Sequence, residues 1–250
     1  MADADPERAK ALASRYGARA VTVAEAINSD AIDAVLIASS TPSHAALLEA
    51  AARAGKAAYC EKPIDLSLAR ARQVVEKVLP LGVPVTVGFN RRFDASHQQL
   101  RRGIEAGAIG KIELVQMVCR ASVMPPLEYL RSSGGQMRDQ AIHFFDLLRF
   151  LTGDEVTTVA ALGAALALAE IAEFDDVDTS IVMLRMRGGA LAQRLARPAS
   201  RRETAPQVPR EPDEAHKRRD SGQDVGRAHI TASGPTDDVG GLGRHGESAP

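Results

Sequence analysis

The sequence predicts an α/β fold: a partial doubly wound parallel sheet, then an incomplete α+β unit with an open sheet, and finally a disordered tail. Three observations lead to this fold class. Short apolar strands alternate with helices up to Phe89, which is typical of a parallel sheet with crossover helices. After Phe93 one strongly apolar helix stands among several long strand candidates. From Arg194 to Pro250 the chain has no Phe, Tyr, Trp, Met or Cys, so it cannot bury enough apolar surface to become ordered.

The individual elements are predicted from apolar runs and from the Pro and Gly residues at their ends. Helices are expected at residues 6–16, 24–29, 43–54, 66–79, 94–106 and 138–151. Strands are expected at residues 20–23, 34–40, 57–61, 84–89, 111–122, 156–166, 179–187 and 190–193. The run AVLIASS at 34–40 is typical of a strand buried on both faces of a parallel sheet. The predicted units are residues 1–90, 91–193 and 194–250.

Composition excludes several functional classes. The 250 residues carry a formal net charge of −1, and aromatic residues make up only 4% with no Trp. This disfavours a nucleic-acid partner. No apolar run approaches the roughly 20 residues of a membrane span. Cys60 and Cys119 lie far apart without metal-ligand spacing, so we expect no metal site and a reduced, cytoplasmic setting.

Lys62 is the first candidate functional residue. It follows the predicted strand 57–61 and precedes Pro63, so it lies at the carboxyl edge of the sheet, where open α/β folds bind ligands. Its ammonium group can donate a hydrogen bond to a substrate hydroxyl or stabilise developing negative charge. A cis Lys62–Pro63 bond would turn the lysine sharply into the cleft. A solvated loop lysine is the alternative, and spacing alone favours it.

Asp139 and His143 form the second candidate pair. They are four residues apart in the predicted helix 138–151 and therefore share a face, with Asp146 on the same stripe. The residues around them are strongly apolar, so the helix is buried. A histidine in such a position can be a general base that a carboxylate orients. The alternative is a satisfied core histidine with a capping aspartate. A zinc site is disfavoured because no third His or Cys ligand has suitable spacing.

Two further groups lie at predicted strand ends. Arg91 and Arg92 follow strand 84–89 and could bind substrate or cofactor oxygens, or they could be an ordinary charged strand exit. Ser40 and Thr41 lie at the carboxyl end of strand 34–40, an edge where ligands bind, but their hydroxyls could simply cap the next helix. The only G-x-G-x-x-G pattern, at 241–246, lies in the predicted tail without a preceding strand, so we reject it as a phosphate loop.

Four ordered segments carry a resemblance to a known family. They are AVLIASSTPSHAALLEAAARAGKAAYCEKP, VGFNRRFD, GAIGKIELV and SSGGQMRDQAIHFFDLLRFLTG. Together they resemble the glucose–fructose oxidoreductase/inositol dehydrogenase family (Gfo/Idh/MocA), and within it the inositol 2-dehydrogenases, over residues 1 to about 193. The resemblance implies a Rossmann domain, an α/β domain with a large open sheet, and hydride transfer between a cyclitol or sugar carbon and NAD.

The resemblance also implies a role for each matching residue. Lys62 would contact the substrate and the nicotinamide ribose. His143 would be the general base that takes the hydroxyl proton. Asp139 would bind substrate and orient that base, and Arg91 would help to hold substrate. Asp3 resembles the acidic residue that binds the adenosine ribose and favours NAD over NADP.

Further expectations follow from the same resemblance. Ser40, Thr41 and Glu61 are expected to bind the cofactor NAD together with Lys62 and Asp3. The expected partner is a small polyol or sugar, with myo-inositol favoured over other cyclitols. A homo-oligomer is expected for the full-length family member, with neither nucleic acid nor membrane as a partner.

The chain departs from the family at both ends. The family begins with a strand and a G-x-G-x-x-G turn about 20 residues before the acidic residue, whereas Asp3 is almost the first residue here. After Gln193 the resemblance stops. The sequence that follows is rich in Arg, Pro and Gly and lacks aromatic residues, as expected for a GC-rich gene read in the wrong frame, so we expect a frameshift near codon 193. We therefore expect a truncated enzyme. The alternative function is a non-catalytic fragment or interaction module.

Overall fold

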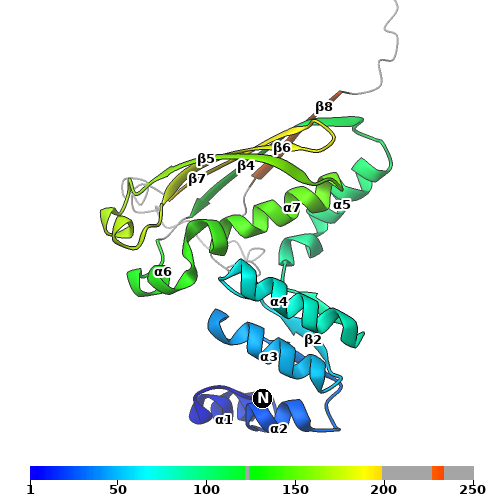
Figure 1. Ribbon diagram of the computed structural model, residues 1–250, viewed down its shortest axis with the longest axis vertical. Coiled ribbons are helices and arrows are strands. Elements are labelled where there is room, and N and C mark those ends of the chain that lie inside the picture. Colours follow the sequence, from blue (N-terminus) through cyan, green and yellow to red (C-terminus); the bar gives the residue numbers. More distant parts are fainter. Residues whose placement is uncertain (122–123, 199–226, 234–250) are drawn as a thin grey trace, which may run out of the picture.

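The computed structural model describes residues 1–121, 124–198 and 227–233. Figure 1 shows two lobes, one built on a small sheet and one on a larger sheet that lies across two helices. The short segment η2 (Asn90–Phe93) follows the small sheet and leads into the second lobe. The unit boundaries proposed from the sequence stay a prediction.

Most expected elements are present, with ends that shift by a few residues. The helices are α1 (Pro6–Arg15), α2 (Val23–Asn28), α3 (Thr41–Arg53), α4 (Leu68–Val78), α5 (Ala95–Glu105), α6 (Leu127–Ser133) and α7 (Ile142–Thr152). The strands are β1 (Ala34–Ile37), β2 (Ala57–Cys60), β3 (Val85–Val87), β4 (Lys111–Ala121), β5 (Val156–Ala164), β6 (Thr179–Met186), β7 (Leu191–Pro198) and β8 (Arg227–Ser233). The remaining short turns are η1 (Leu79–Leu81), η3 (Met137–Ala141) and η4 (Ala169–Phe174).

Side-chain caps explain where several helices begin. The Asp5 carboxylate accepts hydrogen bonds from the first backbone N–H groups of α1. Thr22 and Glu25 form a reciprocal capping box at the start of α2, and Asp94 caps α5. Such caps satisfy backbone donors that the helix itself leaves unpaired.

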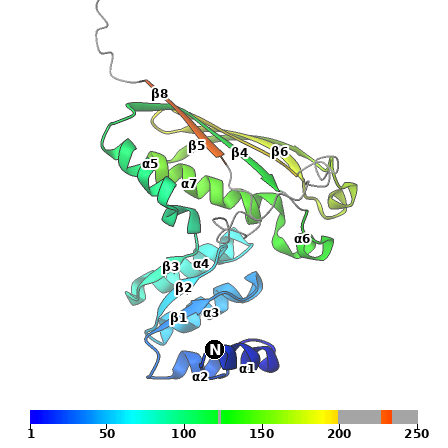
Figure 2. The same ribbon diagram turned by 180° about the vertical axis from the view of Figure 1, so that it is seen from behind.

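The small sheet is parallel, with strand order β1-β2-β3. Figures 1 and 2 show α3 and α4 on the same side of it. Ile37, Leu48, Cys60 and Val74 form the core between the sheet and these helices. The prediction that strand 34–40 is buried on both faces is wrong, because Leu36 on the other face is 72% exposed. Both crossover helices lie on the same side and leave that face uncovered.

The predicted strand at 20–23 is also wrong. Residues 19–22 form no regular element, although the Val21 N–H donates to the Met1 carbonyl at 2.9 Å and the Met1 ammonium donates to the Arg19 carbonyl. A strand needs a ladder of such bonds to a neighbour, and β1 pairs only with β2 among the described strands. The β-propensity of AVTV is therefore not realised here.

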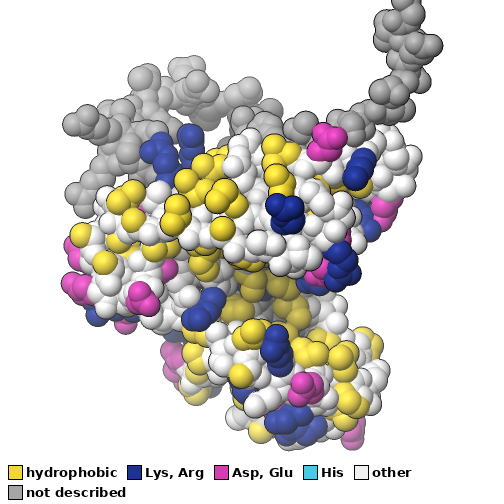
Figure 3. Space-filling model, turned by 45° about the horizontal axis from the view of Figure 1, so that its top comes forward, with side chains coloured by type: hydrophobic (Ala, Val, Ile, Leu, Met, Phe, Trp, Pro, Cys, Tyr) yellow, Lys and Arg dark blue, Asp and Glu magenta, His cyan; other side chains and the backbone are white. Residues whose placement is uncertain are grey.

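The large sheet is mixed, with strand order β5-β6-β7-β4-β8. Helices α5 and α7 lie on one face, between the sheet and the first lobe (Figures 1 and 2). Along β6, inward residues such as Val182 alternate with exposed residues such as Met183, as expected for a sheet covered on one side. Apolar side chains gather on the outer face (Figure 3), and the exposed Leu162 and Met183 lie on that face.

The structure differs from the predicted tail in two places. Residues 194–198 extend β7, which pairs with β4 and β6, and residues 227–233 form β8 beside β4. Backbone pairing does not depend on aromatic content, which was the basis of the prediction. The rest of the predicted tail lies outside the described residues. The prediction also missed α6 and η4, which have only 7 and 6 residues.

Two absences apply to the described part of the chain. None of its helices is long and apolar enough to cross a membrane. It likewise contains no group of three His, Cys, Asp or Glu side chains arranged to hold a metal ion.

Candidate active site

Lys62 lies just beyond the end of β2, at the carboxyl edge of the small sheet. The Lys62–Pro63 peptide bond is cis, as the sequence suggested. The loop is fixed by His44, whose ring nitrogens lie 2.8 Å from the Pro63 carbonyl oxygen and 2.9 Å from the Ser39 carbonyl oxygen. His44 is 1% exposed. The sequence suggested cofactor binding or capping for Ser40 and Thr41 and did not reveal this role of His44.

Lys62 and Asp139 meet across the two lobes. The Lys62 ammonium donates to the Asp139 carboxylate Oδ1 at 2.7 Å and to the Asp139 backbone oxygen at 2.8 Å. Their side chains are 15% and 18% exposed, so solvent screens this pair less than a surface pair. Residues 77 positions apart in the chain therefore form one polar centre.

The segment that carries Asp139 differs from the prediction. Instead of a continuous α-helix over 138–151, η3 is a π-helical turn that leads into α7. A π turn has a different backbone hydrogen-bond pattern from an α-helix, and such turns often occur at functional sites. Here the Asp139 carbonyl of that turn accepts the second Lys62 hydrogen bond.

Tyr129 is a member of this centre that sequence reasoning missed. Its hydroxyl donates to the other carboxylate oxygen of Asp139, Oδ2, at 2.9 Å. Burial, followed by the nearby Asp139 charge, raises the pKa of Tyr129 to about 12, so the phenol keeps its proton. The sequence shows only a tyrosine between the predicted strand 111–122 and the predicted helix 138–151.

His143 is the candidate base. Burial lowers its pKa to about 4, and the Lys62 and Arg91 charges act in the same direction against opposing effects from Asp139 and Asp146. The imidazole is therefore neutral near pH 7 and able to accept a proton. Its Nδ1 is buried and has no hydrogen-bond partner within the described part of the chain. The orientation of this ring by Asp139 stays a prediction.

We expect the His143 imidazole to make stability depend on pH. In the unfolded chain its pKa is near the ordinary 6.5, and in the folded protein it is about 4. Between these values the unfolded state binds more protons, so the free energy of unfolding falls as the pH is lowered from about 6.5 to 4, by at most about 3 kcal/mol. Urea unfolding of the wild type and His143→Asn across this range measures the effect. If the free energy of unfolding fell by the same amount in the wild type and in His143→Asn, His143 would not be the source of the pH dependence.

Arg91 and Arg92 occupy different surroundings. The Arg91 guanidinium lies over the Phe144 ring, with its carbon 4.9 Å from the ring centroid. Arg92 forms a bidentate pair with the buried Asp146, at 2.8 and 2.6 Å. Asp146, predicted on the stripe of Asp139 and His143, is therefore engaged by Arg92.

The remaining predicted cofactor residues are placed as follows. Ser40 and Thr41 begin α3, and the Ser40 side chain makes no capping hydrogen bond. Glu61 accepts a hydrogen bond from the Tyr59 hydroxyl at 3.3 Å. Asp3 accepts from the Asp5 N–H at 2.9 Å, near the start of α1. Among the described residues, Asp3 also lies 3.9 Å from the Arg8 guanidinium, and its contacts are thus within its own end of the chain.

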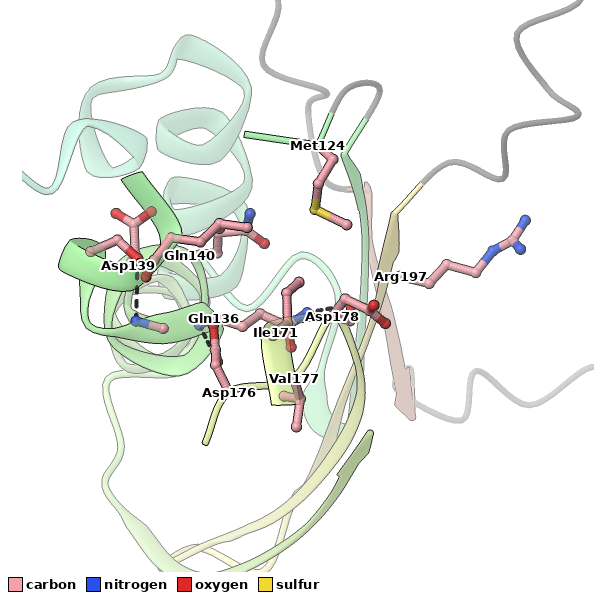
Figure 4. A pocket seen from close by; sticks show the side chains of 12 residues that line it. Met124, Gln136, Asp139, Gln140, Ile171, Asp176, Val177, Asp178 and Arg197 are labelled. Atoms are coloured by element: carbon pink, nitrogen blue, oxygen red, sulfur yellow. Dashed lines mark hydrogen bonds between the residues drawn. The ribbon is translucent and has the colours of Figure 1, made fainter. Parts of the chain in front are cut away.

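A small cavity of about 30 Å³ lies behind Asp139 (Figure 4). Residues of η3, η4 and the segment before β6 line it, including Gln136, Ile171 and Asp178. The Gln136 N–H donates to the Asp176 carboxylate at 2.9 Å along this wall. A water needs roughly 10–15 Å³ of such space, so the cavity accommodates one or two waters and is too small for a sugar-sized molecule.

Comparison with known proteins agrees with this geometry. Residues 1–89 match the model of the oxidoreductase family with an NAD-binding Rossmann fold. Residues 97–206 match the GFO/IDH/MocA C-terminal domain. The chain belongs to the Gfo/Idh/MocA oxidoreductase family. This confirms the resemblance of the four sequence segments and the α/β fold class.

Among its relatives, the inositol 2-dehydrogenase of Rhizobium meliloti is 43% identical over 193 residues, which cover 77% of this chain and 58% of the relative. A crystal structure of a myo-inositol dehydrogenase from Corynebacterium glutamicum superposes with a TM-score of 0.75 at 38% identity, over 80% of this chain and 60% of the other. A scyllo-inositol dehydrogenase from Lactobacillus casei, solved with NAD(H) and scyllo-inositol, gives a TM-score of 0.70 at 26% identity, over 80% and 61%. The chain thus spans about three-fifths of the length of these proteins.

Proposed function

We propose that this chain carries the catalytic residues of an NAD-dependent oxidoreductase that oxidises one hydroxyl of a cyclitol or sugar to a ketone. The Lys62–Asp139 ion pair is the observation that carries the proposal, because it joins both lobes beside a neutral His143. Family membership and the inositol dehydrogenases among its relatives support myo-inositol as the favoured substrate.

The proposed roles follow from charge and protonation. Neutral His143 accepts the proton of the reacting hydroxyl. Lys62, held by Asp139, donates a hydrogen bond to the same oxygen and stabilises the negative charge that develops there. Arg91 is positioned by Phe144 to bind other oxygens of the substrate. NAD, when bound, supplies the acceptor for the hydride that leaves the carbon.

The described residues fit one half of NAD. Ser40, Thr41, Glu61 and Lys62 lie at the carboxyl edge of the small sheet, where such folds hold the nicotinamide end. Within the described ranges, no glycine-rich turn connects a strand to a helix N-terminus in the way a pyrophosphate requires. We therefore propose that these four residues contact the nicotinamide ribose and that Asp3 contacts the adenosine ribose, and we assign no described residue to the pyrophosphate.

Two measurements on the full chain test the proposal. Calorimetric titration with NAD measures cofactor binding, and NADH absorbance measures turnover of myo-inositol, scyllo-inositol and a panel of sugars. We expect NAD binding and the highest turnover with a cyclitol. Absence of both NAD binding and turnover would contradict the proposal and favour the non-catalytic fragment or interaction module. Turnover of a sugar alone would correct the substrate and keep the reaction.

A further inference from the structure

Tyr129 lies where a substrate would meet the Lys62–Asp139 pair. Its hydroxyl binds Asp139 Oδ2 while Lys62 binds Oδ1, and its side chain is 48% exposed. We propose that Tyr129 is a specificity-determining residue whose hydroxyl oxygen accepts a hydrogen bond from a second hydroxyl of the polyol, next to the one that is oxidised. This inference rests on the proposed function and adds a substrate contact to it.

The direction of this hydrogen bond follows from counting protons. A phenol has one proton and two acceptor lone pairs, and Tyr129 gives its proton to Asp139. A carboxylate only accepts, and the Lys62 ammonium only donates, so no other arrangement satisfies all three groups. The Tyr129 oxygen is then left as an acceptor. It therefore selects an O–H group and disfavours a carbonyl or carboxylate at the same place.

The same count distinguishes the recognised hydroxyl from the reacting one. Oxidation converts the reacting hydroxyl into a carbonyl, which has no proton to donate. A contact that requires a donor would be lost in the ketone product. Tyr129 therefore suits a neighbouring hydroxyl, which keeps its proton throughout the reaction.

The backbone fixes Tyr129 relative to the first lobe. Helix α6 ends at Gly134, which has φ 87°, a conformation that favours glycine. A Cβ added there would lie 2.5 Å from Leu66 Cδ2, in the segment just after Lys62 and Pro63. The end of α6 thus packs directly against the loop that presents Lys62. This contact places α6, which carries Tyr129, beside the segment that follows Lys62, and Tyr129 itself is joined to Asp139 by its hydrogen bond.

The test uses the full chain with NAD present and measures myo-inositol binding by calorimetry. Tyr129→Phe keeps the ring and removes only the hydroxyl. We expect it to weaken myo-inositol binding about tenfold, the effect of one lost hydrogen bond, with unchanged NAD affinity. Tyr16→Phe is the matched control, because Tyr16 is 63% exposed at the end of α1. Equal binding by the two variants would overturn the inference.

A set of mono-deoxy inositols separates substrate contact from an indirect effect through Asp139. We expect the cyclitol that lacks the recognised hydroxyl to bind wild type and Tyr129→Phe equally, while the other members keep the tenfold difference. A uniform loss on every member would overturn the inference, because Tyr129 would then act only on Asp139. If wild type binds NAD but no polyol, the proposed function and the inference fail together, a result distinct from equal binding by the variants.

Discussion

Replacing Lys62 by methionine should have the largest effect on catalysis. The variant keeps an unbranched side chain but removes the proposed donor to the reacting hydroxyl, so we expect NADH formation from a polyol to fall by a factor of at least about 10². It also leaves the Asp139 carboxylate, 18% exposed, without its cation. We expect the free energy of unfolding to fall by about 2–3 kcal/mol. Steady-state kinetics and urea unfolding measure the two effects.

A second ion pair provides the control for Lys62→Met. Lys10 and Glu7 have the same 2.7 Å separation, but their side chains are 65% and 80% exposed. Lys10→Met should therefore leave both stability and activity nearly unchanged. The double variant Lys62→Met/Asp139→Leu removes both charges and should recover much of the stability without the activity. If Lys62→Met and Lys10→Met have the same activity and the same free energy of unfolding, the Lys62–Asp139 pair contributes to neither catalysis nor stability.

The sequence predicted the site through local signals. Lys62 before Pro63, and Asp139 four residues before His143, are visible in the chain, and the structure places all three near one another. The direct Lys62–Asp139 bond spans 77 residues, and no local pattern encodes such a distance. Only the resemblance to a family connected the two segments in advance.

The features that the sequence did not reveal depend on tertiary context. Tyr129 lies on α6, a helix of 7 residues, which is too short to show helical periodicity. The π turn at η3 has no distinct sequence pattern in this chain, so the sequence predicts an ordinary α-helix over 138–151. The strand predicted at 20–23 fails because strand formation depends on an available partner edge as well as on propensity.

Replacing the buried Arg194 by an apolar residue should stabilise the protein. Its side chain is 1% exposed at an inward position of β7, where neighbouring inward residues such as Ala192 and Ala196 are apolar. Its Nη1 donates to Ser180 Oγ at 3.2 Å, while Nε and Nη2 are buried without hydrogen-bond partners among the described residues. The guanidinium also lies over the Phe144 ring, 5.1 Å from its centroid. Burial lowers the pKa of Arg194, which shows that the charged form is disfavoured there.

Arg194→Met retains an unbranched side chain and removes the charge and both unpaired donors. We expect the free energy of unfolding to rise by about 1–4 kcal/mol, since apolar residues of similar volume often replace poorly compensated buried charges at a gain. The control is Arg185→Met, because Arg185 is exposed on the neighbouring strand β6 and should change stability by less than about 0.5 kcal/mol. Urea unfolding of the wild type and both variants measures these changes in the free energy of unfolding. A loss of stability in Arg194→Met would mean that the Phe144 and Ser180 contacts outweigh the desolvation of the guanidinium.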